Sequence, residues 1–320
     1  MKVGVLQFFG WADRKTDLNS VYTRAIERFE IMDREGYDAV WLAEHHFSSY
    51  SVCPSVHMMG AVVAMRTRRL RIGTAVSLAP FYHPLRLAEE VALLDVLSGG
   101  RVNWGAGRGF SRGEFAAFGI PVEESASLFR ENVEIVLKAW TEQRLSYQGP
   151  HFQCDAVEVL PKPIQRPHPP VWMAATSESA IDWAASRGFS ILMDPHCTHV
   201  ELAQKRRHYG ERMAAAGFTA EGRDIPMARL IAIADNAGRA AEIAARGAGW
   251  MVGSYVGPKG GISDPVQRYV NEVIIRGTWQ SVLDQILSLR ETAQLNYLLC
   301  APLSRESFTL LTDRVLPRLI

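Results

Sequence analysis

Two adjacent histidines, preceded by a glutamate, stand where an apolar run of the sequence ends. Glu44, His45 and His46 follow residues 39–42, a run that predicts a buried parallel strand. In a closed barrel of alternating strands and helices, side chains at the carboxyl ends of the strands line the active site. An imidazole there can move a proton to or from a bound ligand, so we expect the chemistry at this position.

Only one of the two imidazoles can face a pocket if the strand geometry continues this far. Successive residues of a strand point to opposite faces, so the two rings diverge. We prefer His45, because it is in phase with Trp41 and Ala43. The alternative, in which either ring is a hydrogen-bonded histidine of the core, stays open.

Two turns could together bind a phosphate. Residues 105–109 follow the fourth predicted strand, and Arg108 in this glycine-rich turn, beside Gly107, offers a forked cation. Thr176 and Ser177 follow the fifth strand, where a helix begins with unpaired N–H groups and its positive dipole end. A surface arginine and an ordinary helix cap also explain these patterns. A dinucleotide-binding fingerprint would need a helix directly after the glycine turn and an acidic residue about twenty residues later. We expect neither in this sequence.

Two further clusters could form pocket walls. Phe8, Phe9, Trp11 and Phe47 stand at the ends of the first two strands and could cover an aromatic ligand, although such residues also plug barrels. Residues 194–199 contain Asp, His and Cys side chains, but their spacing matches no usual zinc site, so we expect pocket wall and no metal. The candidates for the substrate pocket are Phe8, Trp11 and Asp194.

Short apolar runs alternate with segments of helical periodicity, which predicts parallel strands joined by helices. The predicted strands are 3–8, 39–42, 70–77, 102–106, 171–174, 189–193, 227–233 and 296–300. The repeat does not reverse into two halves, which favours a closed (β/α)8 TIM barrel over an open doubly wound sheet. The length of 320 residues suits a single barrel domain over residues 1–320.

Two segments interrupt the alternation. Residues 145–170 carry glycine and many prolines, which predicts a small hairpin and loop inserted before the fifth strand. Residues 253–264 are rich in glycine and lie between the seventh and eighth strands. We expect a mobile loop there that acts as a lid.

Composition narrows the classes of partner. The net charge is +1, so neither nucleic acid nor a membrane surface is an expected partner. The four cysteines are widely spaced, and the first apolar segment is too short for a signal peptide, so we expect reduced thiols and a cytoplasmic location. The helix predicted around residues 56–65 is apolar on more than one face, which predicts a homodimer.

Several motifs, in order along the chain, resemble the bacterial luciferase-like flavin-dependent monooxygenases. They are residues 41–47 (WLAEHHF), 72–76 (IGTAV), 83–86 (HPLR), 94–101 (LDVLSGGR), 107–109 (GRG) and 183–188 (WAASRG). The resemblance covers most of the chain and weakens after about Asp235. It implies a TIM-barrel flavoprotein that takes reduced FMN (FMNH2) from a separate flavin reductase. With O2, and through a C4a-peroxyflavin, such an enzyme oxidises a small organic substrate.

The resemblance also implies roles for individual residues. His45 matches the family's essential histidine near the flavin, and Ala75 and Val76 match its non-prolyl cis peptide beneath the flavin ring. Gly107 stands where the light-emitting luciferase subunit has a reactive cysteine. Light emission is therefore not expected.

The cofactor's phosphate would lie in the turn after the fifth strand and against Arg108. In that turn, Ala174, Thr176 and Ser177 are the candidate contacts, and Thr176 replaces a glutamate of the luciferases. The change removes a negative charge that would oppose a dianionic phosphate.

Two rival functions remain in view. One is hydride transfer with the deazaflavin F420 by an oxidoreductase of the same superfamily, and the other is flavin binding without catalysis. The pattern at residues 44–46 is closer to the FMN group, and retention of His45 argues against loss of catalysis. Nothing in the sequence predicts which substrate is oxidised.

Overall fold

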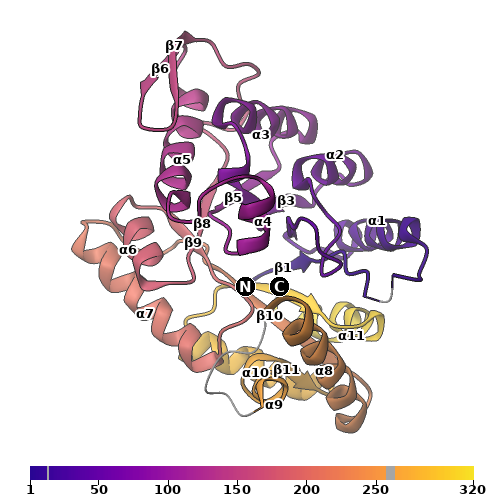
Figure 1. The fold of residues 1–320 in the computed structure, drawn as a ribbon. Helices are drawn as coiled ribbons and strands as arrows, with labels where there is room; N and C mark the ends of the chain where they lie inside the picture. Colours follow the sequence, from indigo (N-terminus) through magenta and orange to yellow (C-terminus); the bar gives the residue numbers. More distant parts are fainter. Residues whose placement is uncertain (13, 257–263) are drawn as a thin grey trace.

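A curled parallel β-sheet lies at the centre of the computed structural model, which describes residues 1–12, 14–256 and 264–320 (Figure 1). Its hydrogen-bonded order is β11-β10-β12-β1-β2-β3-β5-β8-β9. A parallel bridge between Met193, just after β9, and Met227 in β10 closes this order on itself and leaves β11 outside. The arrangement is consistent with a (β/α)8 barrel. The strands are β1 Lys2–Gln7, β2 Ala39–Leu42, β3 Arg71–Thr74, β4 Ser77–Leu78, β5 Val102–Gly107, β8 Val171–Ala174, β9 Ser190–Leu192, β10 Pro226–Ile233, β11 Ile275–Gly277 and β12 Tyr297–Pro302.

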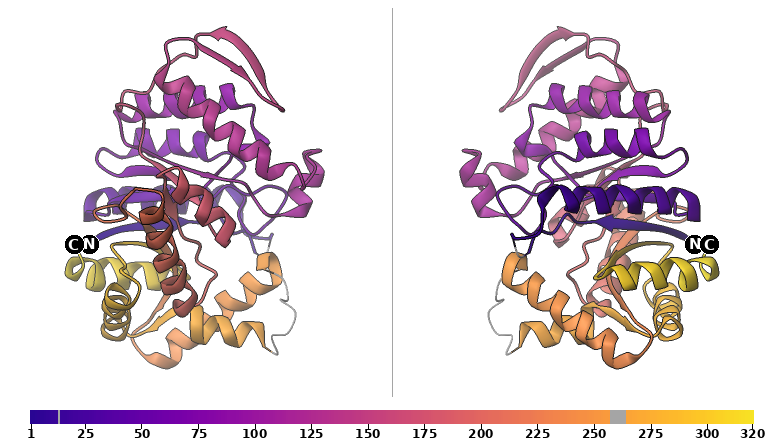
Figure 2. Two further views of the ribbon diagram at one scale, coloured as in Figure 1. Left: turned by 90° about the vertical axis from the view of Figure 1, so that its left-hand side faces the viewer. Right: turned by 90° about the vertical axis from the view of Figure 1, so that its right-hand side faces the viewer.

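Helices follow most strands and lie around the sheet (Figures 1 and 2). Parallel neighbours need such crossovers, because the chain must return to the starting edge before the next strand. The helices are α1 Leu18–Glu35, α2 Val56–Arg66, α3 Pro84–Ser98, α4 Arg112–Ala117, α5 Ser125–Thr141, α6 Glu178–Ser186, α7 His199–Ala215, α8 Ala237–Met251, α9 Pro265–Arg268, α10 Trp279–Thr292 and α11 Arg305–Leu310. In the described residues, no helix has the length and apolar character needed to span a membrane.

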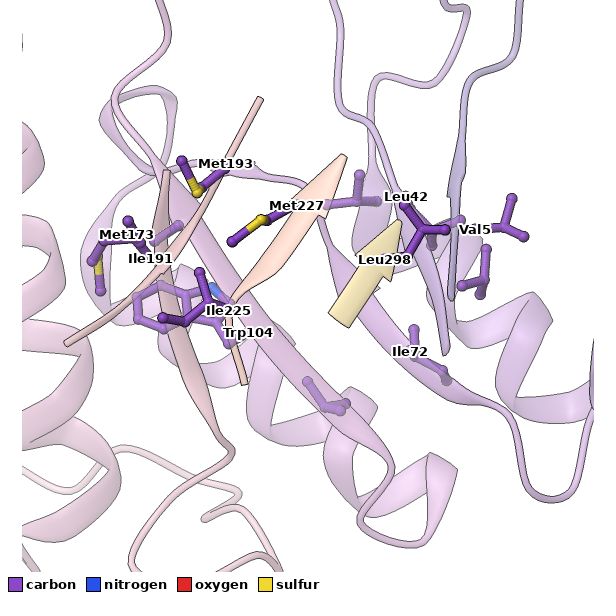
Figure 3. Close-up of a cluster of buried hydrophobic side chains, with 14 of the residues drawn as sticks. Val5, Leu42, Ile72, Trp104, Met173, Ile191, Met193, Ile225, Met227 and Leu298 are labelled. Carbon is purple, nitrogen blue, oxygen red and sulfur yellow. The ribbon is translucent and has the colours of Figure 1, made fainter. Parts of the chain in front are cut away.

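Alternate residues of β2 pack into different apolar clusters. Val40 and Leu42 belong to a large cluster that also holds buried residues of the surrounding helices, and Leu42 is drawn in Figure 3 with its neighbours from other strands. Ala39, Trp41 and Ala43 belong to the second cluster. Because strand side chains alternate, a residue in phase with Ala43 continues on this second side.

Large rings fill the barrel interior toward the amino ends of the strands. The Trp41 ring meets the Trp172 ring edge-on at 5.2 Å, and its indole N–H donates to the Tyr297 hydroxyl at 3.1 Å. A Cβ atom at Gly73 would lie 2.2 Å from a ring carbon of Trp41, so only glycine leaves room for this ring. The filled interior leaves the carboxyl ends of the strands as the place for a cavity.

The structure differs from the predicted elements in three places. The third predicted strand, 70–77, is split into β3 and β4, with Ala75 and Val76 between them. The short strand β11 was not predicted, and it extends the sheet beyond β10. The short helix α4 begins soon after the glycine turn, so the expectation of no prompt helix there is wrong.

The structure describes the first interrupting segment and only part of the second. An antiparallel hairpin, β6 Leu145–Gln148 and β7 Gln153–Val157, precedes β8 and extends from the body of the molecule (Figure 2). The predicted lid begins in a π-helical turn over Val252–Val256. Its residues 257–263 lie outside the described part of the chain.

Candidate functional site

A cavity of about 510 Å³ opens at the carboxyl ends of the barrel strands, within the usual size range of ligand sites. Residues from β1, the segment after β2, the β3–β4 break, and the ends of β5, β8 and β9 line it. Apart from Trp11, the predicted site residues are all in its wall. They are Phe8, His45, Ala75, Val76, Gly107, Arg108, Ala174, Thr176, Ser177 and Asp194.

The aromatic residues at the ends of the first two strands do not form one pocket. Phe8 lines the cavity, whereas Phe9 is buried in the core and Phe47 is 72% exposed. The Trp11 indole N–H donates to the carbonyl of Thr16 at 2.8 Å, and Trp11 is absent from the cavity wall. The expectation of a shared aromatic pocket is therefore wrong, because the chain turns away after Phe8.

His45 lies in the cavity wall between two aromatic rings. Its imidazole is stacked on Phe8 with 6.4 Å between ring centroids, and it meets Tyr50 edge-on at 5.1 Å. The His45 Nδ1 atom lies 3.8 Å from Oε1 of Glu114, a buried carboxylate of α4. The ring is thus held by its neighbours while it remains in contact with the cavity.

His46 faces a different environment. Its Nε2 lies 3.0 Å from Oε1 of Glu44, and its backbone N–H donates to Oε1 of Glu114 at 3.0 Å. Glu44 is only 2% exposed, and its other oxygen accepts a hydrogen bond from the backbone N–H of Leu78. His46 is absent from the cavity wall, whereas Glu44 and His45 are both part of it. The structure therefore agrees with the preference for His45, but β2 ends at Leu42, so strand alternation does not account for the difference.

A cis peptide bond forms part of the cavity wall at the β3–β4 break. It joins Ala75 to Val76, as the family resemblance implied, and both residues line the cavity. A Cβ atom at Gly107 would lie 2.2 Å from Cγ2 of Val76 and 3.4 Å from Cβ of Ala174. The glycine therefore leaves space for the Val76 side chain, and a larger residue at this position would displace it.

Hydrogen-bond donors gather where β5 and β8 end. Arg108 is exposed, and its guanidinium donates to the Ser125 hydroxyl at 3.4 Å. Ser177 caps α6 by accepting the backbone N–H of Ala180 at 3.3 Å, and the exposed Thr176 precedes it. The amino end of a helix beside a guanidinium and hydroxyl groups is a suitable environment for a phosphate.

Sequence reasoning missed two residues of this corner, Arg130 and Trp183. Both line the cavity, and the Arg130 guanidinium carbon lies 5.8 Å from the centroid of the Trp183 ring. Arg130 follows Phe129, which lies on the buried face of α5. The sequence offered one signal for this position: a polar residue stands next to a buried helical face, on a helix that follows a barrel strand.

Asp194 lines the cavity on the β9 side. Burial alone would raise its pKa, but Lys205 at 3.6 Å, the neighbouring His196 and Arg229 hold the pKa below its usual value. Asp194 is therefore ionised at neutral pH. Among the described residues, no group of three or more His, Cys, Asp and Glu side chains is placed to hold a metal ion.

Comparisons with known proteins identify the family of this chain. The family model for luciferase-like monooxygenases matches residues 1–294. The oxygenase component of the flavin-dependent trigonelline monooxygenase of Acinetobacter baylyi is 29% identical over 201 residues, which are 62% of this chain and 55% of that protein. This chain spans about half the length of the first curated relatives that it matches.

Solved structures match over the whole chain. Monooxygenase RslO1 from Streptomyces bottropensis has a TM-score of 0.90 and 27% identity, with 100% of both chains covered. The oxygenating constituent of 3,6-diketocamphane monooxygenase from Pseudomonas putida, in complex with FMN, has a TM-score of 0.85 and 20% identity, covering 100% of this chain and 99% of that one. An F420-dependent secondary alcohol dehydrogenase shares the fold with a TM-score of 0.81 at 18% identity, covering 100% and 99%.

Proposed function

The chain belongs to the luciferase-like monooxygenase family, and on that premise we propose that it uses reduced FMN and O2 to oxidise a small organic substrate. One observation carries the proposal: His45 and Arg108, from different strands, line a single cavity. A flavin mononucleotide has a reactive ring at one end and a phosphate at the other. The two side chains suit these two ends.

The residues of the cavity fit such a cofactor. Arg108, Thr176 and Ser177 supply charged and hydroxyl donors for a phosphate, together with the amino end of α6. Ala75 and Val76 supply an apolar wall for a flat ring. When bound, the reduced flavin supplies the electrons that activate dioxygen, and the protein supplies position and shielding from water.

His45 is the group that we assign to proton transfer. Its ring reaches the cavity from the wall formed by Phe8 and Tyr50, so it can donate a hydrogen bond or move a proton on that side. Glu114, 3.8 Å from Nδ1, favours the orientation in which the other nitrogen faces the cavity. The aromatic neighbours exclude water from that side of the ring.

A separate flavin reductase is the proposed source of the reduced cofactor. The Acinetobacter relative is the oxygenase component of its monooxygenase, which supports this assignment.

The test is an oxygen-uptake assay with purified protein and chemically reduced FMN. Aldehydes, ketones, sulfonates and aromatic compounds are added in turn, and we expect substrate-dependent oxygen consumption with at least one class. Reduced F420 is run in parallel under anaerobic conditions. Hydride transfer from reduced F420, with no substrate-dependent oxygen use with FMN, would replace the monooxygenase by the rival deazaflavin enzyme.

We also propose that the chain forms a homodimer through α2 and α3, which contact one another. Met58 and Met65 on α2 are 74% and 76% exposed, and Leu93 and Leu97 on α3 are 48% and 51% exposed. Exposed large apolar side chains on two adjacent helices are typical of an interface. Sedimentation velocity should show a dimer that Met58→Glu with Met65→Glu dissociates, and a monomeric native protein would refute this.

A further inference from the structure

A second cavity, of about 390 Å³, adjoins the first at the barrel mouth. Leu6 and Phe8 line both cavities. The second one is bounded by α1, by the carboxyl ends of β1 and β12, and by the end of α8. It therefore lies beside the site already described, on the side away from Arg108.

Three arginines line this second cavity, and in the described part of the chain no acidic side chain does. Arg24 and Arg28 lie one turn apart on α1, and Arg305 begins α11. Across the described ranges, none of the three guanidinium groups is in an ion pair. Positive charge without a compensating carboxylate attracts anions, and a concave wall of low dielectric strengthens the effect.

Arg28 is the most constrained of the three. Its Nη1 donates to Oε1 of Gln7 at 3.1 Å, and its guanidinium carbon lies 4.8 Å from the centroid of the Phe308 ring. Burial lowers its pKa, the Tyr37 phenol partly opposes this effect, and the charge of Arg305 adds to it. An arginine still keeps its proton at neutral pH, so a half-buried cation faces the cavity with neutral partners only.

An aromatic wall separates this cavity from His45. Phe8 and Tyr50 both line the arginine cavity, and their ring centroids are 5.2 Å apart. His45 contacts both rings and lines the first cavity. A molecule with its end at Arg28 would therefore have to pass only this pair of rings to reach His45.

We propose that the arginine cavity binds the anionic end, a carboxylate, sulfonate or phosphate, of the molecule that the enzyme oxidises. The remainder of that molecule extends past Phe8 toward His45. The oxidation in this statement depends on the proposed function, whereas the anion site does not require flavin. The substrate class is thus small organic molecules with one anionic group.

The experiment measures binding of 4-fluorobenzoate and of its neutral analogue 4-fluorobenzamide to the flavin-free full chain by fluorine NMR at low salt. We expect the benzoate to bind at least about tenfold more tightly than the benzamide, which is the ratio of affinities that one hydrogen bond between charged groups produces. Arg28→Gln should abolish this preference, and Arg28→Lys should keep part of it. Arg305→Gln, at an exposed position, should reduce the preference without any effect on folding.

Two control variants locate the site. Arg34→Gln removes the same charge from α1 at an exposed position outside the cavity, and Arg108→Gln removes one of the two arginines that line the other cavity. Both should keep the preference for benzoate. Equal affinity of the native protein for the two probes would overturn the proposal, and so would loss of the preference in Arg108→Gln but not in Arg28→Gln. Failure of the oxygen-uptake assay would leave the probe result unchanged, so the two proposals fail separately.

Discussion

His45 and His46 are neighbours with the same side chain, and each imidazole is 11% exposed, yet they occupy different regions of the molecule. His45 is packed against Phe8 and Tyr50 in the cavity wall. His46 is hydrogen-bonded to the buried carboxylate of Glu44. The surroundings in which each side chain packs, and not its type or exposure, therefore decide whether it can meet a ligand.

The largest expected effect is that of His45→Ala. Turnover should fall by about a hundred- to ten-thousand-fold, the range for loss of a positioned acid or base, while FMN binding is retained. Steady-state kinetics with saturating reduced FMN measure turnover, and a separate titration with FMN measures binding. Unchanged turnover would remove His45 from the mechanism and erase the difference between the two histidines.

The variant Arg108→Ala tests whether the cavity that His45 lines is the flavin site. The variant should bind FMN more weakly by about 1.5–3 kcal/mol, the range for a hydrogen bond to a charged group. Riboflavin, which lacks the phosphate, should bind equally to the native protein and to the variant. Equal affinity of the native protein for FMN and riboflavin would contradict the phosphate placement.

His46→Ala should act on stability more than on chemistry. It leaves the Glu44 carboxylate, whose side chain is 0% exposed, without one of its hydrogen-bond partners. We expect the free energy of unfolding to fall by about 1–3 kcal/mol in urea titrations, compared with the native protein. If His46→Ala and His45→Ala had the same free energy of unfolding and the same loss of turnover, the two histidines would not have the different roles described here.

A third histidine, His199, has a pKa that its surroundings lower. Burial and the Arg229 charge lower its pKa from 6.5 to about 4, and a hydrogen bond with the backbone of Val273 partly opposes this. The unfolded chain therefore takes up the proton first, and the folded state loses stability as the pH falls from about 6.5 toward 4. Unfolding titrations at pH 7 and pH 5 should differ less for His199→Gln than for the native protein. An identical difference in both would show that another group causes the pH dependence.

Strand ends were predictable from the sequence, and most of the candidate site follows from them. The ends of β2, β5 and β8 placed His45, Arg108 and Thr176 at the cavity. These residues meet because the carboxyl ends of parallel strands lie at the same end of the barrel. The preference for His45 over His46 agrees with the structure, but β2 ends at Leu42 and Glu44 also lines the cavity, so strand alternation does not explain it.

Contacts between segments far apart in the sequence were not predictable. Glu114 reaches both histidines from α4, a short helix whose pattern is too brief to be recognised. Arg130 comes from α5, a helix whose apolar residues pack into the core. Trp11 was misplaced because nothing local shows where the chain leaves the pocket after Phe8. Such positions depend on how loops pack, which hydrophobic periodicity does not encode.

A crystal structure of the protein soaked with FMN tests the central claim most directly. The account predicts the phosphate within hydrogen-bonding distance of Arg108 and the Thr176–Ser177 turn, with the flavin ring against Ala75 and Val76 and within reach of His45. Density for FMN in a different cavity, or with its phosphate turned toward His45, would contradict it.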